Sequence, residues 1–254
     1  MTIRTATLNK VLTIEIARPE KKNALTQAMY TAMSDALERA EADDEVRVTL
    51  ITGVGNAFTS GNDVLDFMNA PPDVESTPVG RFLSTITRTK KPVVAAVNGI
   101  AIGIGTTLLL HCDLAYAGQG AVFQMPFVNL GLCPEAGSSF LLPQYLGHRK
   151  AAELLLLGEK FDAQTALACG LVNAVTSDEA LLATALEKAA KLAAQPPASV
   201  RISKALMKQT NNATLEGAMR EELRHFAERL TSMEAAEAFT AFVERRKPDF
   251  SSFK

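Results

Sequence analysis

The stretch that decides the fold is Ala57-Phe58-Thr59-Ser60-Gly61-Asn62-Asp63-Val64, together with the later stretch Asn98-Gly99-Ile100-Ala101-Ile102-Gly103-Ile104-Gly105. Each is a glycine-bearing turn that follows an apolar run typical of a buried strand and leads into a helical pattern. The first N–H groups of a helix have no acceptor within that helix and lie at its positive end. We therefore predict that the N–H groups of Asn62 and Ile104 point at one oxygen and stabilise negative charge on it. Two ordinary tight turns would need the same glycines, and that alternative stays open.

A single acid lies within a third glycine-bearing segment, Pro134-Glu135-Ala136-Gly137-Ser138-Ser139. The residues before it, Leu130-Gly131-Leu132-Cys133, are apolar, so we expect burial to raise the pKa of Glu135 and make it a proton acceptor near neutral pH. Two N–H donors and one such base suit the formation of an enolate, whose oxygen carries the negative charge. A second interpretation stays open, in which Glu135 serves only the positive end of a helix.

Composition and charge exclude several classes of protein. With 47% apolar and 21% charged residues, the chain of 254 residues is typical of a globular protein with a sizeable core. Its formal net charge of −2 argues against a nucleic-acid or membrane partner. The uncharged run Val93–Leu110 reaches the length of a membrane span, about 18 residues, but Asn98 and several glycines favour a strand, a turn and a buried helix. Because the start lacks an apolar signal segment and the end lacks the usual peroxisomal address, we expect a cytoplasmic protein.

The cysteines and histidines give no sign of a metal centre. Cys112, Cys133 and Cys169 match neither a disulfide framework nor a zinc spacing, and the three histidines form no pair at helical spacing. We therefore expect no metal site. The thiols are expected to be reduced and buried, as small apolar residues.

Alternating apolar runs and helical patterns predict an α/β core. Strands are expected at Val11–Ala17, Val46–Thr52, Pro92–Asn98, Asp113–Ala117 and Ala121–Gln124. Thr26 has the character of a helix N-cap, and the buried face of its helix is expected to hold Met29, Met33, Leu37 and Ala40. After about residue 178 the chain is rich in Ala, Leu and Glu with helical periodicity. We therefore divide the chain into a core at 1–195 and a helical region at 196–254.

These segments resemble the crotonase superfamily, also called the enoyl-CoA hydratase/isomerase family, over nearly the whole chain. The matching blocks are Arg18–Leu25, Ala57–Phe67, Pro92–Asp113, Phe123–Ser139, Ala163–Val175 and Ala241–Phe250. The resemblance implies a crotonase-like spiral of ββα units with a helical C-terminal trimerisation region, in a homotrimer or a dimer of trimers. It also implies an acyl-CoA thioester as substrate, so that coenzyme A arrives with the substrate and is not a separate cofactor.

The resemblance further implies the site residues. Asn62 and Ile104 would supply the N–H groups that meet the thioester oxygen, with Glu135 as the catalytic base. The substrate-binding residues would be Lys22, Ala24, Leu25, Ser60, Gly61, Asp63, Val64 and Phe127. Candidates for contact with the adenine and the 3′-phosphate are Phe242, Arg245 and Lys247.

Two groups of charged residues keep alternative interpretations. The basic residues Arg18, Lys21 and Lys22 either meet a phosphate or form a solvated loop. Asp63 either contacts the substrate or serves the first turn of a helix.

Two departures from the hydratases decide the predicted activity. Hydratases of this superfamily place two carboxylates around one water, whereas this chain has Thr107 and Phe127 at those positions. The segment around Glu135 resembles the 3,2-trans-enoyl-CoA isomerases, in which a single Glu moves a proton from C2 to C4. We therefore predict an isomerase that converts 3-enoyl-CoA to 2-trans-enoyl-CoA in fatty-acid or related acyl-CoA metabolism.

Three other activities stay open. They are an enoyl-CoA hydratase, a non-catalytic acyl-CoA-binding protein, and an isomerase of ring-derived or branched thioesters. The length of the acyl chain is expected to depend on the loop Asn69–Pro78 and on the helix that contains Phe82.

Overall fold

The computed structural model describes residues 2–64, 66 and 77–253. Its larger sheet has six strands in the order β1-β2-β3-β5-β7-β10. They are β1 Ile3–Leu8, β2 Val11–Ile16, β3 Val48–Gly53, β5 Val93–Val97, β7 Leu114–Gly118 and β10 Ala174–Thr176. The hairpin of β1 and β2 is antiparallel, and the other neighbours run parallel. The inner strands β3 and β5 are buried on both faces, as expected for parallel strands with helices on either side.

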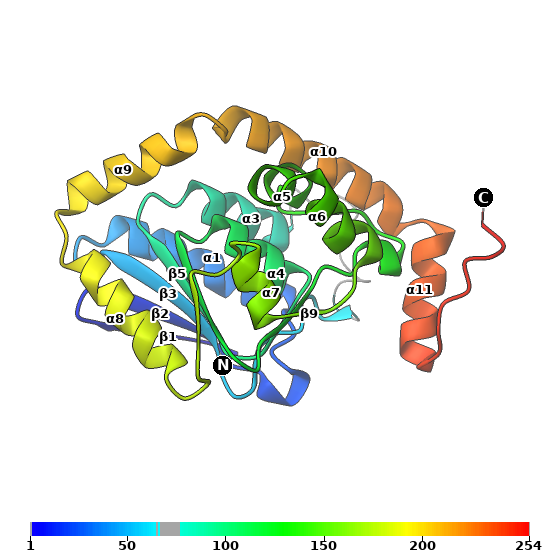
Figure 1. Ribbon diagram of the computed structural model, residues 1–254, viewed down its shortest axis with the longest axis horizontal. Helices are drawn as coiled ribbons and strands as arrows, with labels where there is room; N and C mark the ends of the chain where they lie inside the picture. The colour runs from blue at the N-terminus through cyan, green and yellow to red at the C-terminus, as the bar shows by residue number, and fades with distance from the viewer. Residues whose placement is uncertain (1, 65, 67–76, 254) are drawn as a thin grey trace.

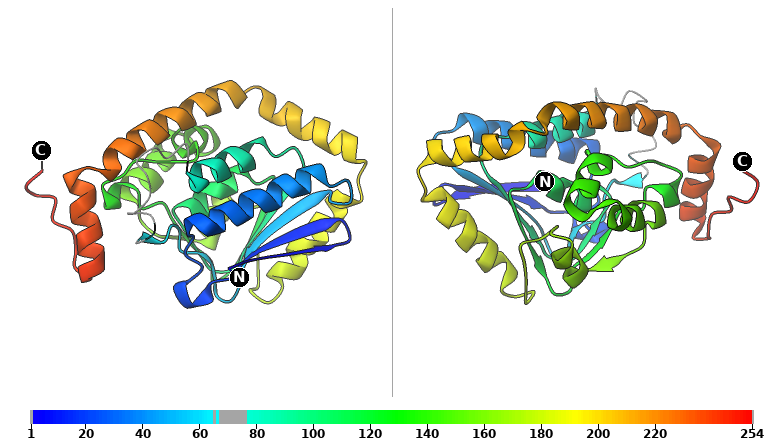
Figure 2. Two further views of the ribbon diagram at one scale, coloured as in Figure 1. Left: turned by 180° about the vertical axis from the view of Figure 1, so that it is seen from behind. Right: turned by 45° about the horizontal axis from the view of Figure 1, so that its top comes forward.

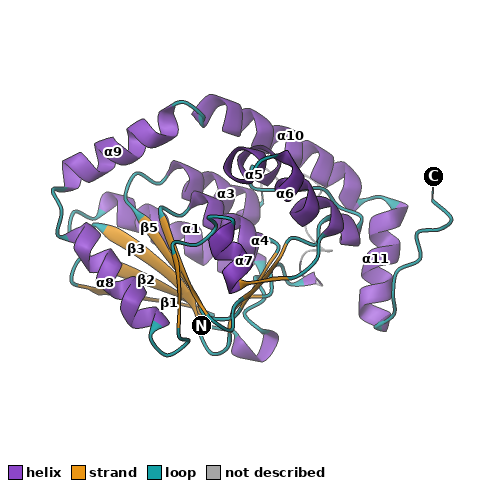
Figure 3. Ribbon diagram, in the orientation of Figure 1, coloured by secondary structure: helices purple, strands orange, loops and turns teal. Residues whose placement is uncertain are grey.

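A smaller sheet joins β4 Ala57–Thr59, β6 Ile100–Ile102, β8 Val122–Gln124 and β9 Phe161–Asp162 in that order. Strands β4, β6 and β8 run parallel, and β9 pairs antiparallel with β8. The two sheets diverge from one end of the molecule, as Figure 3 shows. The chain passes from the larger sheet to the smaller one between β3 and β4, and again between β5 and β6. Each predicted N–H donor therefore comes directly after a strand of the smaller sheet.

Helices cover both faces of the larger sheet (Figure 1). Helices α1 Gln27–Ala42 and α3 Pro78–Arg88 lie side by side on one face, as Figure 2 shows from behind. The Thr26 hydroxyl accepts a hydrogen bond from the Met29 N–H, so α1 begins where the sequence predicts, and its predicted apolar face is buried. Helix α8 Leu181–Ala193 covers the opposite face with a row of mostly small residues: Leu181, Ala185, Ala189 and Ala193.

Short helices surround the smaller sheet. Helix α4 Ile104–Thr107 follows β6 and tightens into a 3-10 turn at Leu108–His111, where the sequence predicts one helix over 105–112. A 3-10 turn is a common way for a helix to end. Further along are α5 Ser138–Leu146, α6 His148–Ala152 and α7 Ala163–Ala168.

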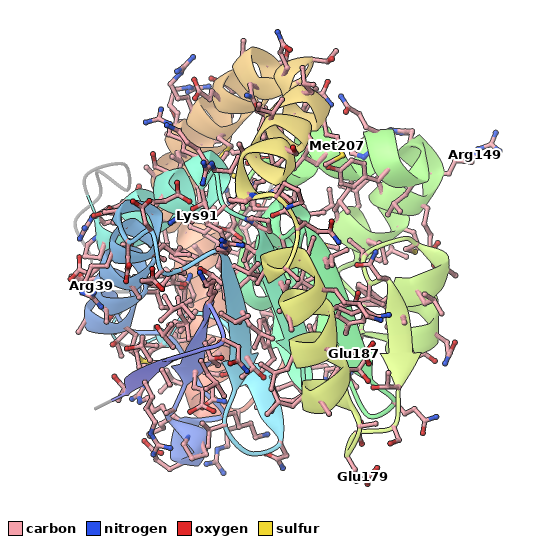
Figure 4. All side chains as sticks on the ribbon, turned by 90° about the vertical axis from the view of Figure 1, so that its left-hand side faces the viewer. Arg39, Lys91, Arg149, Glu179, Glu187 and Met207 are labelled. Atoms are coloured by element: carbon pink, nitrogen blue, oxygen red, sulfur yellow. The ribbon has the colours of Figure 1, made fainter. Side chains whose placement is uncertain are left out.

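The last three helices, α9 Pro197–Gln209, α10 Asn212–Leu230 and α11 Met233–Glu244, form an arch over the molecule (Figure 1). Lys204 attaches α9 to the core, because its Nζ donates to Asp113 Oδ2 at 2.7 Å and to the Lys91 carbonyl at 2.9 Å. Figure 4 shows Lys91 at the edge where the parallel strands of the larger sheet begin, between α1 and α9. The sequence predicts helices over 178–195 and 214–246 and misses α9. The buried residue of α9 is Lys204, and its large apolar residues Ile202, Leu206 and Met207 are exposed. The division at 195 and 196 stays a prediction.

None of the described helices combines the length and the apolar composition needed to span a membrane. The uncharged run Val93–Leu110 instead passes through β5, β6 and α4 into the 3-10 turn, as the sequence predicts. The three thiols are free, but Cys112 and Cys133 are half-buried and Cys169 is buried. The expected burial is confirmed for Cys169, whereas Cys112 and Cys133 are partly buried and pack against the core.

Candidate active site

The two glycine-bearing turns pack against each other after β4 and β6. Gly61 has a φ of +89°, and a Cβ added to it would lie 2.8 Å from the carbonyl oxygen of Ile102. Gly105 approaches the first turn as closely, because an added Cβ would lie 3.0 Å from the carbonyl oxygen of Thr59. Glycine is therefore required at both positions, since any side chain would push the turns apart. This contact places the two predicted N–H donors on adjacent backbones.

Asn62 and Ile104 stand where an N–H is left without a partner. Ile104 is the first residue of α4, so its N–H has no acceptor within the helix. Asn62 pairs with Leu25 in a parallel bridge through its neighbours: Leu25 N–H donates to the Gly61 carbonyl and Asp63 N–H donates to the Leu25 carbonyl, both at 2.8 Å. Within the described residues, neither the Asn62 N–H nor the Ile104 N–H donates to another protein atom. The N–H groups of Asn62 and Ile104 are therefore both available to an oxygen atom of a ligand.

Glu135 is buried, with 7% of its surface exposed. The Thr107 hydroxyl donates a hydrogen bond to its Oε1. Thr107 ends α4, one turn after Ile104, so this bond joins the predicted base to the helix that carries a predicted donor. Burial raises the pKa of Glu135 to about 7, the Thr107 hydrogen bond lowers it, and the charge of Glu222 raises it. The direction agrees with the expectation from the apolar residues that precede Glu135.

We call residues 132–137 the base turn. Its last two residues, Ala136 and Gly137, have left-handed φ values of +58° and +71°. A left-handed alanine costs roughly 1–2 kcal/mol, so its surroundings must hold it there. Helix α5 begins after Gly137, its N-cap, so Glu135 lies before the helix and its carboxylate is not the cap.

The peptide group between Ala136 and Gly137 is held at both ends. His111 Nε2–H donates to the Ala136 carbonyl at 2.7 Å, and the Gly137 N–H donates to Oε2 of Glu222 at 2.6 Å. Burial lowers the pKa of His111 to about 4, so the ring is neutral at pH 7 with its proton on the nitrogen that faces the carbonyl. Glu222 comes from α10 and also accepts from the Ser139 N–H at 2.9 Å and the Ser139 hydroxyl at 2.5 Å. Its carboxylate thereby supplies the acceptors that the first N–H groups of α5 need.

Tyr30 connects α1 to the first glycine-bearing turn. Its hydroxyl donates to Oδ1 of Asn62, and 1% of the residue is exposed. Burial raises the pKa of Tyr30 well above its usual value, and the negative charges of Glu135 and Asp66 raise it as well. The phenol is therefore a neutral hydrogen-bond donor that fixes the Asn62 side chain.

The predicted substrate-binding residues of the N-terminal half lie together. Ser60 N–H donates to the Lys22 carbonyl at 3.0 Å, which lays the segment 22–25 along the first glycine-bearing turn. The structure thus gathers around Asn62 the predicted residues Lys22, Ala24, Leu25, Ser60, Gly61, Asp63 and Val64. Lys22 is exposed and Leu25 is buried, so the segment has one face toward solvent and one toward the core.

Asn23 explains why this segment keeps its place. It is completely buried, and its amide donates to the carbonyls of Val54 and Ala57 at 3.0 and 2.7 Å. Its own carbonyl accepts from the Thr59 hydroxyl at 2.7 Å. The sequence analysis quoted Asn23 within a motif without giving it a role.

Arg18 and Asp63, for which the sequence leaves two interpretations each, form an ion pair with each other. Arg18 Nη1 donates to Asp63 Oδ2 at 2.7 Å and to the Ala24 carbonyl at 3.1 Å. Arg18 therefore has partners inside the protein, whereas Lys21 and Lys22 are exposed, and contact of these basic residues with a phosphate stays a prediction. Asp63 Oδ1 accepts from the Asp66 N–H at 3.3 Å, which is the helix-turn role considered for it.

Phe127 and the C-terminal candidates belong to other parts of the fold than the two glycine-bearing turns. Phe127 is packed in the core, and its carbonyl accepts from the N–H of Leu132, the first residue of the base turn, at 2.9 Å. Phe242 lies on α11 with 60% of its surface exposed. Arg245 ends that helix and Lys247 follows it, both exposed. The roles of these residues stay predictions.

Part of the predicted acyl site lies outside the described residues. This holds for the loop Asn69–Pro78 except its last two residues. Phe82 on α3 is buried, with its ring centre 5.5 Å from that of Tyr30. A cavity of about 710 Å³ between α1, α3 and α10 is lined by Arg81, Arg88, Glu216 and other described residues, but not by the predicted site residues.

Known families and solved structures match this chain over nearly its whole length. The family model for enoyl-CoA hydratase/isomerase matches residues 6–253. The chain belongs to the enoyl-CoA hydratase/isomerase family. Its relatives in this family include enoyl-CoA delta isomerase 2 of Rattus norvegicus, 40% identical over 242 residues, which are 92% of this chain and 61% of that protein. The chain thus spans less than two thirds of the length of that relative.

Two other members of the enoyl-CoA hydratase/isomerase family match along their whole length. The 1,2-epoxyphenylacetyl-CoA isomerase of Escherichia coli strain K12 is 34% identical over 251 residues, which are 95% of each chain. The crystal structure of an enoyl-CoA hydratase/isomerase from Pseudoalteromonas atlantica T6c has a TM-score of 0.94 at 43% identity and covers 99% of this chain and 100% of that one. The fold is therefore the crotonase fold that the sequence predicts, and the family acts on acyl-CoA thioesters.

The sequence analysis missed four residues that shape this site. Thr107 was noticed only as a missing acid, and Tyr30, His111 and Glu222 were not considered. For Glu222 a signal existed, because it stands on the apolar stripe of α10 formed by Leu215, Met219 and Phe226. A carboxylate on a buried stripe needs partners, and here they are the N–H groups of α5.

Proposed function

We propose that this family member is an enoyl-CoA isomerase that converts 3-enoyl-CoA to 2-trans-enoyl-CoA. Glu135 removes a proton from C2, and the N–H groups of Asn62 and Ile104 stabilise the charge that develops on the thioester oxygen of the dienolate. The same carboxyl group then returns the proton to C4. One proton is taken and one is returned, so the reaction consumes neither water nor a second acid.

The observation that supports this proposal best is the hydrogen bond from Thr107 to Glu135. The family resemblance places one of the two hydratase carboxylates at the position of Thr107. A hydroxyl there is no base at neutral pH, but it orients the Glu135 carboxylate through Oε1 and leaves Oε2 for the substrate. Among the described residues, Glu135 is the one carboxylate with a hydrogen bond to α4. The second hydratase position holds Phe127, which is buried and excludes water.

The pKa of Glu135 supports the same role. A base that takes a proton and then returns it works best when its pKa is close to the working pH. Burial brings the pKa of Glu135 to about 7, so both forms of the carboxyl group are available near neutral pH. An exposed glutamate would hold the proton too weakly to return it with similar ease.

The test follows the conversion of a 3-enoyl-CoA to the conjugated 2-enoyl product by absorbance. The wild-type protein is expected to convert it, and Glu135→Gln is expected to lose about 10²–10⁴-fold in kcat, the usual contribution of a general base. The Kd for a saturated acyl-CoA should change little, because the amide keeps the size of the side chain. Glu153→Gln is the matched control, since Glu153 is exposed and pairs with Lys150.

Each other activity has its own outcome in this test. Equal rates for the wild type and Glu135→Gln would remove Glu135 from the mechanism. Rapid hydration of crotonyl-CoA would favour an enoyl-CoA hydratase. Binding of acyl-CoA without turnover of any 2-enoyl or 3-enoyl substrate would favour a non-catalytic binding protein, and turnover of ring-derived or branched thioesters alone would favour the remaining alternative.

We also propose a homotrimer or a dimer of trimers. Large apolar side chains on α9 and α11 are exposed and would gain cover from a second copy: Ile202, Leu206, Met207, Phe242 and Val243. Size-exclusion chromatography with light scattering is expected to give three or six times the mass of the chain. A monomer at all concentrations would contradict the proposal.

A further inference from the structure

The base turn is supported by two residues that the proposed mechanism does not use. His111 ends the 3-10 turn that follows α4, and Glu222 lies on α10, 85 residues after Gly137. Both bind the same peptide group, the one between Ala136 and Gly137. Ala136 alone separates Glu135 from this peptide group, so the orientation of the group helps to set where the Glu135 side chain points.

The two bonds act on opposite ends of that peptide group. The neutral His111 ring donates to the carbonyl oxygen at 2.7 Å, and Glu222 accepts from the N–H at 2.6 Å. Partners at both ends fix the rotation of the peptide plane, which neither partner alone would do. Fixing it matters here because Ala136 has a φ of +58°, a conformation that an alanine rarely adopts without support.

The surroundings of Glu222 show that it is built into this position. Glu222 is 6% exposed, and its carboxylate accepts hydrogen bonds from Gly137 and Ser139. The neighbouring α10 residues Leu215 and Met219 approach Gly137 so closely that a Cβ added there would lie 2.3 Å from Leu215 Cδ1. Helix α10 therefore meets the base turn through both packing and hydrogen bonds.

We propose that His111 and Glu222 form a clamp on the Ala136–Gly137 peptide group that holds Glu135 in its catalytic orientation. Both are positioning residues, and α10 is thereby part of the catalytic apparatus. The proposal rests on the proposed function in so far as Glu135 is taken as the base. The clamp itself is a statement about the backbone of the base turn and can be tested apart from the reaction.

The kinetic test compares Glu222→Gln with Glu221→Gln. Glu221 is the next residue on α10, exposed and paired with Arg224 at 2.7 Å, so it controls for the loss of one carboxylate from this helix. Glu222→Gln is expected to lower kcat by about 10–100-fold, the effect of a small misplacement of a catalytic group, with little change in the Kd of a saturated acyl-CoA. Glu221→Gln is expected to keep the wild-type kcat.

The pH profile adds a result that loss of packing would not give. The charge of Glu222 raises the pKa of Glu135, so Glu222→Gln is expected to move the acid limb of kcat/KM to lower pH. The limb reports Glu135 because the base must be deprotonated to act, and the rate falls as pH drops through its pKa. The other titratable groups that interact with Glu135 are Tyr30 on α1 and Cys133 on the base turn, and burial raises the pKa of both well above this limb, that of Cys133 to about 11.

His111 provides a second and independent pair of variants. His111→Leu removes the donor to Ala136 and is expected to lower kcat to a similar extent. His111→Gln retains an N–H donor on a side chain of comparable reach and is expected to recover part of the rate. The comparison of His111→Leu with His111→Gln tests the proposal even if Glu222→Gln fails to fold. Full wild-type kcat in His111→Leu would overturn the proposal.

Amide hydrogen exchange separates failure of the clamp from failure of the proposed function. In Glu222→Gln the N–H groups of Gly137 and Ser139 are expected to exchange faster than in the wild type and in Glu221→Gln. Faster exchange in a protein whose wild type isomerises no 3-enoyl-CoA would support the clamp and refute the proposed function. Unchanged exchange together with unchanged kcat in Glu222→Gln would overturn the clamp.

Discussion

The glycine-bearing turns and the base turn hold their functional groups in different ways. The turns that carry Asn62 and Ile104 are set by local means: each follows a strand of the smaller sheet, and β4 and β6 pair in parallel. The base turn contains no strand, and it depends on side chains from α4, the 3-10 turn and α10. The donors are therefore fixed by backbone geometry, whereas the base is fixed by tertiary contacts. Substitutions in the two regions should therefore lower the catalytic rate for different reasons.

Among substitutions that leave Glu135 in place, the largest effect is expected where the local geometry of a donor is broken. In Gly61→Ala, the new Cβ would lie 2.8 Å from the Ile102 carbonyl oxygen, so the first turn must move away from the second. Loss of one well-placed donor typically costs about 10²–10³-fold in kcat, and we expect a loss in that range. Steady-state kinetics with a 3-enoyl-CoA measure it.

Gly55→Ala is the matched control for this substitution. Gly55 has a φ of +80°, close to the +89° of Gly61, but an added Cβ would meet only Pro19 Cβ at an ordinary 3.5 Å. Both variants carry the strain of a left-handed alanine, and only one carries the clash between the turns. A loss of kcat as large in Gly55→Ala would show that strain, not the approach of the two turns, decides the rate.

A smaller effect is expected where the two regions meet, at Thr107. Thr107→Val keeps the shape of the side chain and removes the hydrogen bond that lowers the pKa of Glu135, so that pKa should rise above about 7. At neutral pH less Glu135 is then ionised, and we expect about a tenfold loss of kcat/KM, which corresponds to about 1.4 kcal/mol. The acid limb of the pH profile should move to higher pH, opposite to the shift in Glu222→Gln.

Thr107→Ser tests the cause of that loss. It restores the hydroxyl and should recover most of the rate and the wild-type acid limb. A pH profile that is identical in Thr107→Val and the wild type would mean that this hydrogen bond does not act on the base.

The smallest effect is expected from Tyr30→Phe. The change removes the hydrogen bond to the Asn62 side chain and leaves the backbone donor in its turn. A net contribution of about 0.5–1.5 kcal/mol for such a bond corresponds to a loss of about two- to tenfold in kcat. Tyr145→Phe, at an exposed tyrosine on α5, is the control. A loss of kcat as large as in Gly61→Ala would show that the position of the Asn62 N–H depends on α1 and not on local geometry.

The same contrast explains what the sequence could and could not predict. The positions of the donors follow from glycines, strand patterns and helix starts, all of which are local signals. The burial of Glu135 follows from the apolar residues before it, and the N-cap at Thr26 follows from its residue type. The strands and turns, the burial of Glu135 and the N-cap were confirmed because neighbouring residues determine them, whereas the role of Asn62 and Ile104 as donors stays a prediction.

Contacts between residues that are far apart in the sequence could not be predicted from such local signals. Nothing near Arg18 in the sequence indicates its bond to Asp63, and nothing near Thr107 indicates that its hydroxyl meets Glu135. The contact that attaches α9 to the core joins Lys204 to Asp113, which is 91 residues away. Such pairs appear only when the fold brings distant segments together.

The order of the contacts along the chain has a consequence during protein synthesis. The carboxylate that accepts from Gly137 emerges from the ribosome 85 residues after that glycine. A nascent chain can fold its sheets and both glycine-bearing turns first, because N-terminal parts generally fold earlier during synthesis. We expect such a chain to offer both donors to a passing thioester but to lack a properly aimed base, so that catalysis begins only once translation has delivered α10.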